Sequence, residues 1–112
     1  MPTIVDYMYR DSANYKIHLS AVLKGELAEE EIKEIFDLSE DVVFHDCNYF
    51  YPGKTGLPAT TFVDKGYAAY DDDPEWHELV EISHTEAEPT EDVTAAEFLE
   101  AFRNKTALLP PF

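Results

Sequence analysis

The clearest pattern in the chain is a strict alternation of apolar and polar side chains over residues 15–23. The residues that share the apolar side are Tyr15, Ile17, Leu19, Ala21 and Leu23. A period of two is typical of a half-buried β-strand. The preceding stretch, 3–10, is rich in β-branched and aromatic residues, and the DSAN sequence between the two stretches is typical of a turn. We therefore predict an antiparallel β-hairpin at the N-terminus.

Helical spacing replaces this alternation after Gly25. The residues that share one apolar stripe are Ala28, Ile32, Ile35 and Phe36. Glutamates occupy positions 29–31, in the first turn, where carboxylates interact favourably with the positive end of the helix dipole. The pattern predicts a helix over residues 27–38.

A second helix is predicted near the C-terminus. Thr94 and Glu97 have the spacing of a capping box, and Val93 and Phe98 have the spacing of a hydrophobic staple. The apolar stripe of this helix contains Ala95, Phe98, Leu99 and Phe102. The last stretch, ALLPPF, either docks on the core or extends away from it.

Between the two helices the pattern indicates further strands. Residues 41–44 and 76–83 are strand candidates, the second with Val80 and Ile82 facing inward, although a helical turn after Pro74 also fits. Shorter candidates are 60–63 and 67–70. With 112 residues, one hydrophobic core is expected. We predict a single α+β domain over residues 1–112: an N-terminal β-hairpin, a helix, an antiparallel sheet, and a C-terminal helix packed on one sheet face.

Charge limits the possible partners. The chain has 24 acidic and 8 basic residues, a formal net charge of −16. Such a surface repels nucleic acid phosphates and anionic lipid headgroups, which argues against direct nucleic acid binding. The acids are also unevenly spread: Gly66 to Phe102 contains twelve acids and no lysine or arginine, and Glu26 to Asp46 contains nine acids and only Lys33.

The sequence shows no features of a secreted, disulfide-bonded or membrane-spanning protein. Cys47 is the single cysteine, so no intramolecular disulfide can form, and the N-terminal stretch lacks the regions of a secretion signal. No apolar run approaches the roughly 20 residues that span a bilayer. We expect a cytoplasmic protein that does not enter a membrane, with monomer and dimer both open.

Motifs for catalysis or cofactors are weak. The YPGKTG stretch has Asn48 where a phosphate-binding loop requires its first glycine, so a surface turn is predicted. His45, Cys47 and His77 are residue types that bind zinc, but their spacing matches no recognised site. We expect no cofactor and no enzyme activity. The alternative is a small metal-binding protein or metal-dependent enzyme that uses these three residues.

Aromatic residues flank several acidic stretches. Tyrosine and tryptophan are favoured at protein interfaces, and carboxylates can pair with a partner's lysines and arginines. The predicted partner-binding residues are Asp71, Asp72, Asp73, Glu75, Trp76 and Glu78, with a second patch of Glu29, Glu30 and Glu34 and the aromatics Tyr49 and Tyr51. These carboxylates would replace phosphates in the basic groove of a nucleic-acid-binding protein. Two simpler explanations stay open: acids that serve solubility or a saline habitat, and aromatics that fill the core.

The chain also resembles a widespread but uncharacterised group of small bacterial and phage-associated proteins. The stretches that carry the resemblance are YRDSANYK (9–16), KGELAEEEI (24–32), GLP (56–58) and DDDPEWHEL (71–79). The resemblance implies no enzyme activity. In size and acidity the chain is similar to phage-encoded inhibitors of host defence, such as anti-CRISPR and anti-restriction proteins, which often mimic DNA.

Overall fold

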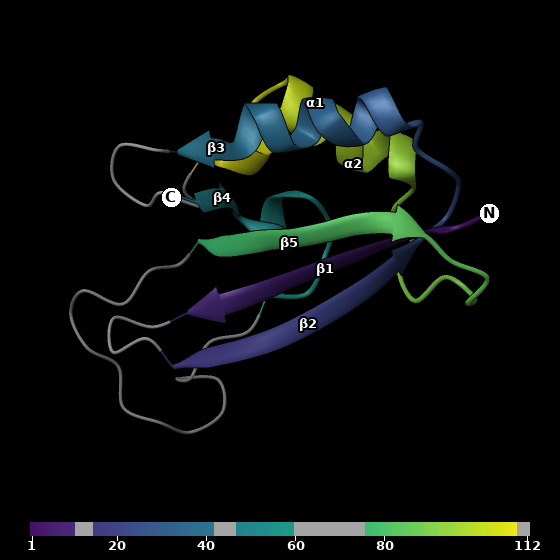
Figure 1. Cartoon of the computed structure of the whole chain (residues 1–112), viewed down its shortest axis with the longest axis horizontal. Coiled ribbons are helices and arrows are strands. Elements are labelled where there is room, and N and C mark those ends of the chain that lie inside the picture. Colours follow the sequence, from purple (N-terminus) through teal and green to yellow (C-terminus); the bar gives the residue numbers. More distant parts are fainter. Residues whose placement is uncertain (11–14, 42–46, 60–75, 110–112) are drawn as a thin grey trace.

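The computed structural model describes residues 1–10, 15–41, 47–59 and 76–109 of the chain (Figure 1). Five strands form one sheet in the order β2-β1-β5-β4-β3, and neighbouring strands of this sheet are antiparallel. The helices α1 and α2 lie together on one side of this sheet (Figure 1). The predicted α+β class, with strands first and a C-terminal helix, is confirmed.

The predicted hairpin consists of β1 (Thr3–Arg10) and β2 (Lys16–Leu23). Their register runs without a break from the Thr3–Leu23 pair to the Arg10–Lys16 pair. Every second residue of β1, beginning with Thr3, is buried. The apolar side chains that alternate along the hairpin therefore face the helices.

Strand β5 (His77–His84) lies where a strand was predicted, but the inward positions differ. The register against β1 shifts between Asp6 and Tyr7, which is the mark of a β-bulge. Val80 is the extra residue, because Asp6 pairs with Glu81 and Tyr7 pairs with Leu79. The side chains of β5 therefore do not alternate strictly between the two faces of the sheet at this point. Consequently Leu79 and Ile82 are both buried, whereas Val80 is 51% exposed. The prediction that Val80 faces inward is wrong, and the prediction for Ile82 is confirmed.

The other side of β5 pairs with β4 (Cys47–Phe50), which in turn pairs with the two-residue strand β3 (Glu40–Asp41). Of the predicted strand at 41–44, the described residues include only Asp41. The candidates at 60–63 and 67–70 lie outside the described residues. A 3₁₀ turn, η1 (Pro52–Lys54), follows β4, as predicted for this stretch.

Helix α1 (Glu29–Ser39) begins two residues later than predicted, because Ala28 is extended and serves as the N-cap residue. Ala28 is exposed and does not join the apolar stripe, whereas Ile35 is buried. Helix α2 (Ala95–Arg103) begins with the predicted capping box. The Thr94 hydroxyl accepts a hydrogen bond from the Glu97 amide at 3.1 Å, and the Thr94 amide donates to the Glu97 carboxylate at 3.0 Å.

An aromatic cluster forms the centre of the core. Phe50 of β4 and Phe98 and Phe102 of α2 are fully buried, with ring centroids 5.1–6.1 Å apart. The chain after α2 docks on this core through η2 (Thr106–Leu108), where the Ala107 carbonyl accepts a hydrogen bond from the Tyr51 amide at 2.8 Å. This packing fixes the position of the helices over the sheet.

Candidate functional site

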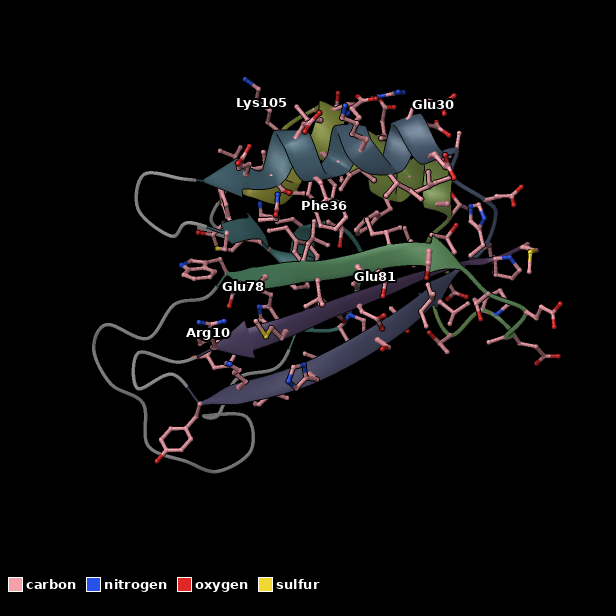
Figure 2. The ribbon with its side chains drawn as sticks, viewed as in Figure 1. Arg10, Glu30, Phe36, Glu78, Glu81 and Lys105 are labelled. Atoms are coloured by element: carbon pink, nitrogen blue, oxygen red, sulfur yellow. The ribbon has the colours of Figure 1, made fainter. Side chains whose placement is uncertain are left out.

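The side of the two helices that faces away from the sheet is strongly acidic. Because Ile35 and Phe98 point into the core, the charged residues of α1 and α2 are left on the outside. Figure 2 shows Glu30 and Lys105 on this side and Phe36 pointing from α1 toward the sheet. We call it the helical surface, and its carboxylates are those of Glu29, Glu30, Glu31, Glu34, Asp37, Glu40, Glu97 and Glu100.

Few basic side chains offset these carboxylates. Over residues 29–40 and 95–105, eight carboxylates face three basic side chains, those of Lys33, Arg103 and Lys105, for a net charge of −5. Arg103 is occupied by Glu34: its Nε and Nη2 donate to the two carboxylate oxygens at 2.7 and 2.8 Å. This bidentate contact joins α2 to α1. Between described residues, the other carboxylates of the helical surface form no ion pair.

Hydrogen bonds hold several of these groups in the ionised form. The hydrogen bond from Arg103 lowers the pKa of Glu34, and the same contact raises the pKa of Arg103. Hydrogen bonds with the backbone and the side chain of Thr94 lower the pKa of Glu97. The helical surface therefore keeps its negative charge at neutral pH.

The opposite face of the sheet is nearly balanced. Its charged residues on β1, β2 and β5 are Asp6, Arg10, Lys16, Glu78 and Glu81, a net charge of −1. Figure 2 shows Arg10 and Glu78 near each other on this face. The distance from Arg10 Nε to Glu78 Oε2 is 3.0 Å, although the N–H is not aimed along a hydrogen bond, so the contact is an ion pair. This face of the sheet is therefore less negative than the helical surface.

The structure describes only some of the residues that the sequence grouped into partner-binding patches. Asp71, Asp72, Asp73 and Glu75 lie outside the described residues. Trp76 is partly buried just before β5, and Glu78 is buried in its contact with Arg10.

Tyr49 does not join Glu29, Glu30 and Glu34, although the sequence analysis placed it in their patch. It lies opposite Glu78 on β5, and its ring packs edge to face on Tyr51, with centroids 6.4 Å apart. The three glutamates belong to the helical surface instead.

Two of the three zinc-binding candidates, Cys47 and His77, point to opposite sides of the sheet. His77 points to the helix side of the sheet, where its ring packs 5.4 Å from that of Tyr9. Cys47 has the same strand parity as Tyr49 and therefore faces the other side. His45 lies outside the described residues. Among the residues that the structure describes, no group of three or more histidine, cysteine, aspartate or glutamate side chains could hold a metal ion.

The η1 turn does not present its amides to an anion. The amides of Lys54, Thr55 and Leu57 donate to the carbonyls of Tyr51 and Pro52 at 2.9–3.1 Å. The predicted surface turn is confirmed.

Comparison with known proteins adds no assignment. No protein-family model, no curated protein and no solved structure matches the chain. Within the described ranges, no helix is both long and apolar enough to cross a membrane.

Sequence reasoning missed five members of the helical surface, Glu31, Asp37, Glu40, Glu97 and Glu100. Helical spacing could have found Asp37, because Glu30 and Asp37 are seven residues apart on the side of α1 opposite the apolar stripe. The ion pairs of Glu34 and Glu78 join residues distant in sequence, and no local pattern predicts them.

Proposed function

We propose that the protein is a non-enzymatic, cytoplasmic binding protein that inhibits a basic, nucleic-acid-binding protein. A component of a phage-defence complex, such as a CRISPR or restriction system, has the required chemistry. The observation that carries the proposal is the uneven distribution of charge in the fold. The helical surface has a net charge of −5, and the opposite face of the sheet has a net charge of −1. A charge spread only for solubility would not need this asymmetry.

The spacing of the carboxylates on α1 supports mimicry of a phosphate backbone. The helix has 11 residues and contains five of the acids, of which four, Glu29, Glu30, Glu31 and Asp37, are not paired with Arg103. At about 1.5 Å per residue, it carries one such carboxylate per about 4 Å of its axis. One strand of duplex DNA carries one phosphate per about 3.4 Å. A groove whose lysines and arginines match phosphates can therefore match this helix.

The proposed complex has a clear physical signature. Attraction between an acidic surface and a basic groove speeds association and is screened by salt. Duplex DNA should compete for the same groove, because both ligands bind through their negative charges. An acidic surface that serves solubility alone has neither property.

The test is capture of host proteins on the immobilised protein at low and high salt, followed by elution with duplex DNA. The proposal predicts a nucleic-acid-binding protein that high salt and DNA both release. If no captured protein is released by DNA, the proposal is wrong. A variant with Asp71, Asp72 and Asp73 changed to lysine tests the other predicted acidic patch: it should lose the captured protein while its circular dichroism spectrum stays that of the wild type.

A further inference from the structure

One edge of β5 is only partly covered by its neighbouring strand. On the side away from β1, β4 pairs with His77 and Glu78 alone. In the described part of the chain, residues 79–84 of β5 have a strand partner only in β1. An uncovered strand edge offers backbone N–H and C=O groups with which an extended chain can pair.

The free backbone groups of this edge point toward α1. The Thr85 amide donates to the Pro2 carbonyl at 3.0 Å, so the backbone of Thr85 faces the β1 side. Alternate residues of an antiparallel strand direct their N–H and C=O groups to opposite sides. The backbone groups of His84 and Ile82 therefore face α1. No hydrogen bond among the described residues occupies them from that side.

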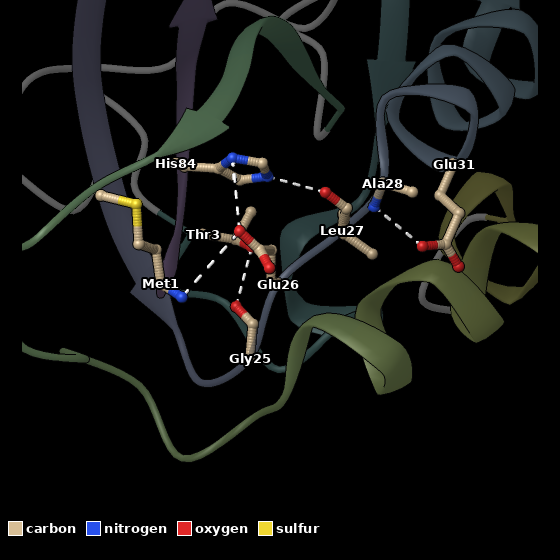
Figure 3. A network of polar contacts seen from close by, with 8 residues as sticks. All are labelled: Met1, Thr3, Gly25, Glu26, Leu27, Ala28, Glu31 and His84. Atoms are coloured by element: carbon tan, nitrogen blue, oxygen red, sulfur yellow. Dashed lines mark hydrogen bonds and ion pairs between the residues drawn. The ribbon is translucent and has the colours of Figure 1, made fainter.

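A groove lies along this edge, between the first turns of α1 and the end of β5. Its volume is about 300 Å³, and its lining residues are Glu29, Ile32, Ile82, Ser83 and His84. The two isoleucines give it an apolar floor. One end is closed, because the His84 Nε2 donates to the Leu27 carbonyl at 2.7 Å (Figure 3).

The charges around the groove select a cationic occupant. Glu29 lines the groove and is exposed. On the outer face, Glu81 of β5 lies directly opposite Asp6 of β1, a like-charge pair that is unfavourable without a cation. The Ser20 hydroxyl donates to Asp6, and within the described residues no lysine or arginine pairs with Asp6 or Glu81. A basic side chain placed beside Glu81 would relieve this repulsion.

We infer that this groove binds an extended segment of a partner protein, added to the sheet as a strand beside β5. The segment alternates small apolar side chains, which cover Ile32 and Ile82, with lysines or arginines, which point to the outer face beside Glu81. The basic residue at the end of the segment, where strand pairing stops, reaches Glu29. Backbone pairing with Ile82 and His84 supplies the affinity, and the alternating side chains supply the selectivity. The inference does not rest on the proposed function, because the site lies in the groove and shares only Glu29 with the helical surface.

The test uses a blocked peptide of sequence Lys-Val-Lys-Val-Lys, added to the full chain and followed by NMR. Strand addition predicts that hydrogen exchange slows at the amides of Ile82 and His84. At a peptide concentration of ten times Kd, the slowing should be about tenfold. The Ser83 amide, which faces β1, should change little. Uniform changes over the acidic surface, or no change at β5, would overturn the inference.

Two controls separate strand addition from attraction by charge alone. The peptide Lys-Pro-Lys-Pro-Lys has the same charge but lacks the N–H groups of the two valines, which would pair with β5, and it should leave Ile82 and His84 unprotected. The double variant Glu29→Gln/Glu81→Gln should weaken binding of the first peptide by about three- to tenfold, as expected for two exposed ion pairs.

A matched variant with the same net charge, Asp37→Asn/Glu100→Gln, should bind the peptide as the wild type does. Equal losses in the two variants would contradict the groove. This outcome would leave the proposed function intact, because DNA-displaceable capture is measured separately.

Discussion

Replacement of Arg10 by methionine should destabilise the fold, because it leaves the Glu78 carboxylate without its cation. The side chain of Glu78 is only 12% exposed, and that of Arg10 is 36% exposed. The two atoms in contact, Arg10 Nε and Glu78 Oε2, are themselves shielded from solvent. A carboxylate in such a place cannot recover the lost interaction by hydration.

The expected loss lies between two limits. Removal of one partner from a fully buried ion pair costs about 3–5 kcal/mol. An exposed pair contributes about 0–1 kcal/mol. Because Arg10 is more than one third exposed, we expect the free energy of unfolding to fall by about 2 kcal/mol. For a domain of this size, that corresponds to a fall of about 8 °C in Tm.

Urea denaturation followed by circular dichroism measures this loss. The double variant Arg10→Met/Glu78→Met is the decisive control, because apolar replacement of both partners is often neutral. It should recover most of the stability that Arg10→Met loses. The reasoning is refuted if Arg10→Met unfolds at the same urea concentration as the wild type, or if the double variant is no more stable than Arg10→Met. Confirmation would mean that Glu78 stabilises the sheet and is not available to a partner.

Three further predictions concern the helices and the bulge. Thr94→Ala should lower the free energy of unfolding by about 1 kcal/mol through loss of the helix cap, measured in the same urea experiment. Ile82→Ala should cost about 2–5 kcal/mol, whereas Val80→Ala should cost about 0.5 kcal/mol or less, since Val80 is an exposed bulge residue; equal losses would contradict the register of β5. The Glu34–Arg103 contact lowers the pKa of Glu34, so its stabilisation is present at neutral pH and is lost as pH falls below about 4.5 through the folded-state value. The difference in Tm between the wild type and Glu34→Gln should therefore shrink between pH 7 and pH 3.

The sequence predicted the elements whose structure depends on residues that are close together in the chain. The alternation over residues 15–23 identified β2, because one side of that strand meets the core and the other meets solvent. The Thr94–Glu97 spacing identified the start of α2 to the residue, because a capping box is a contact between neighbours in sequence. The class of the fold follows from these elements.

Features that depend on distant residues were not predictable in this way. Leu79 and Val80 are both apolar, and only the register against β1 decides which one faces the core. Glu34 and Glu78, two of the predicted partner-binding residues, each form an ion pair with an arginine that is distant in sequence. Such pairs arise from the packing of α1 on α2 and of β1 beside β5, which no single stretch encodes. The prediction for Asp71–Asp73 stays a prediction.

The central claim is that the arrangement of the acids, and not their number, selects the partner. Two triple variants test it, because each takes the formal net charge from −16 to −13. One neutralises the helical surface with Glu30→Gln, Asp37→Asn and Glu100→Gln. The other neutralises the segment between β5 and α2, where the changes are Glu86→Gln, Glu88→Gln and Asp92→Asn.

The measurement is the amount of nucleic-acid-binding protein that each immobilised variant captures and duplex DNA then releases. The account predicts that the helical-surface variant loses most of this capture and that the other variant keeps it. Equal capture by the two variants, at any level, would contradict the account.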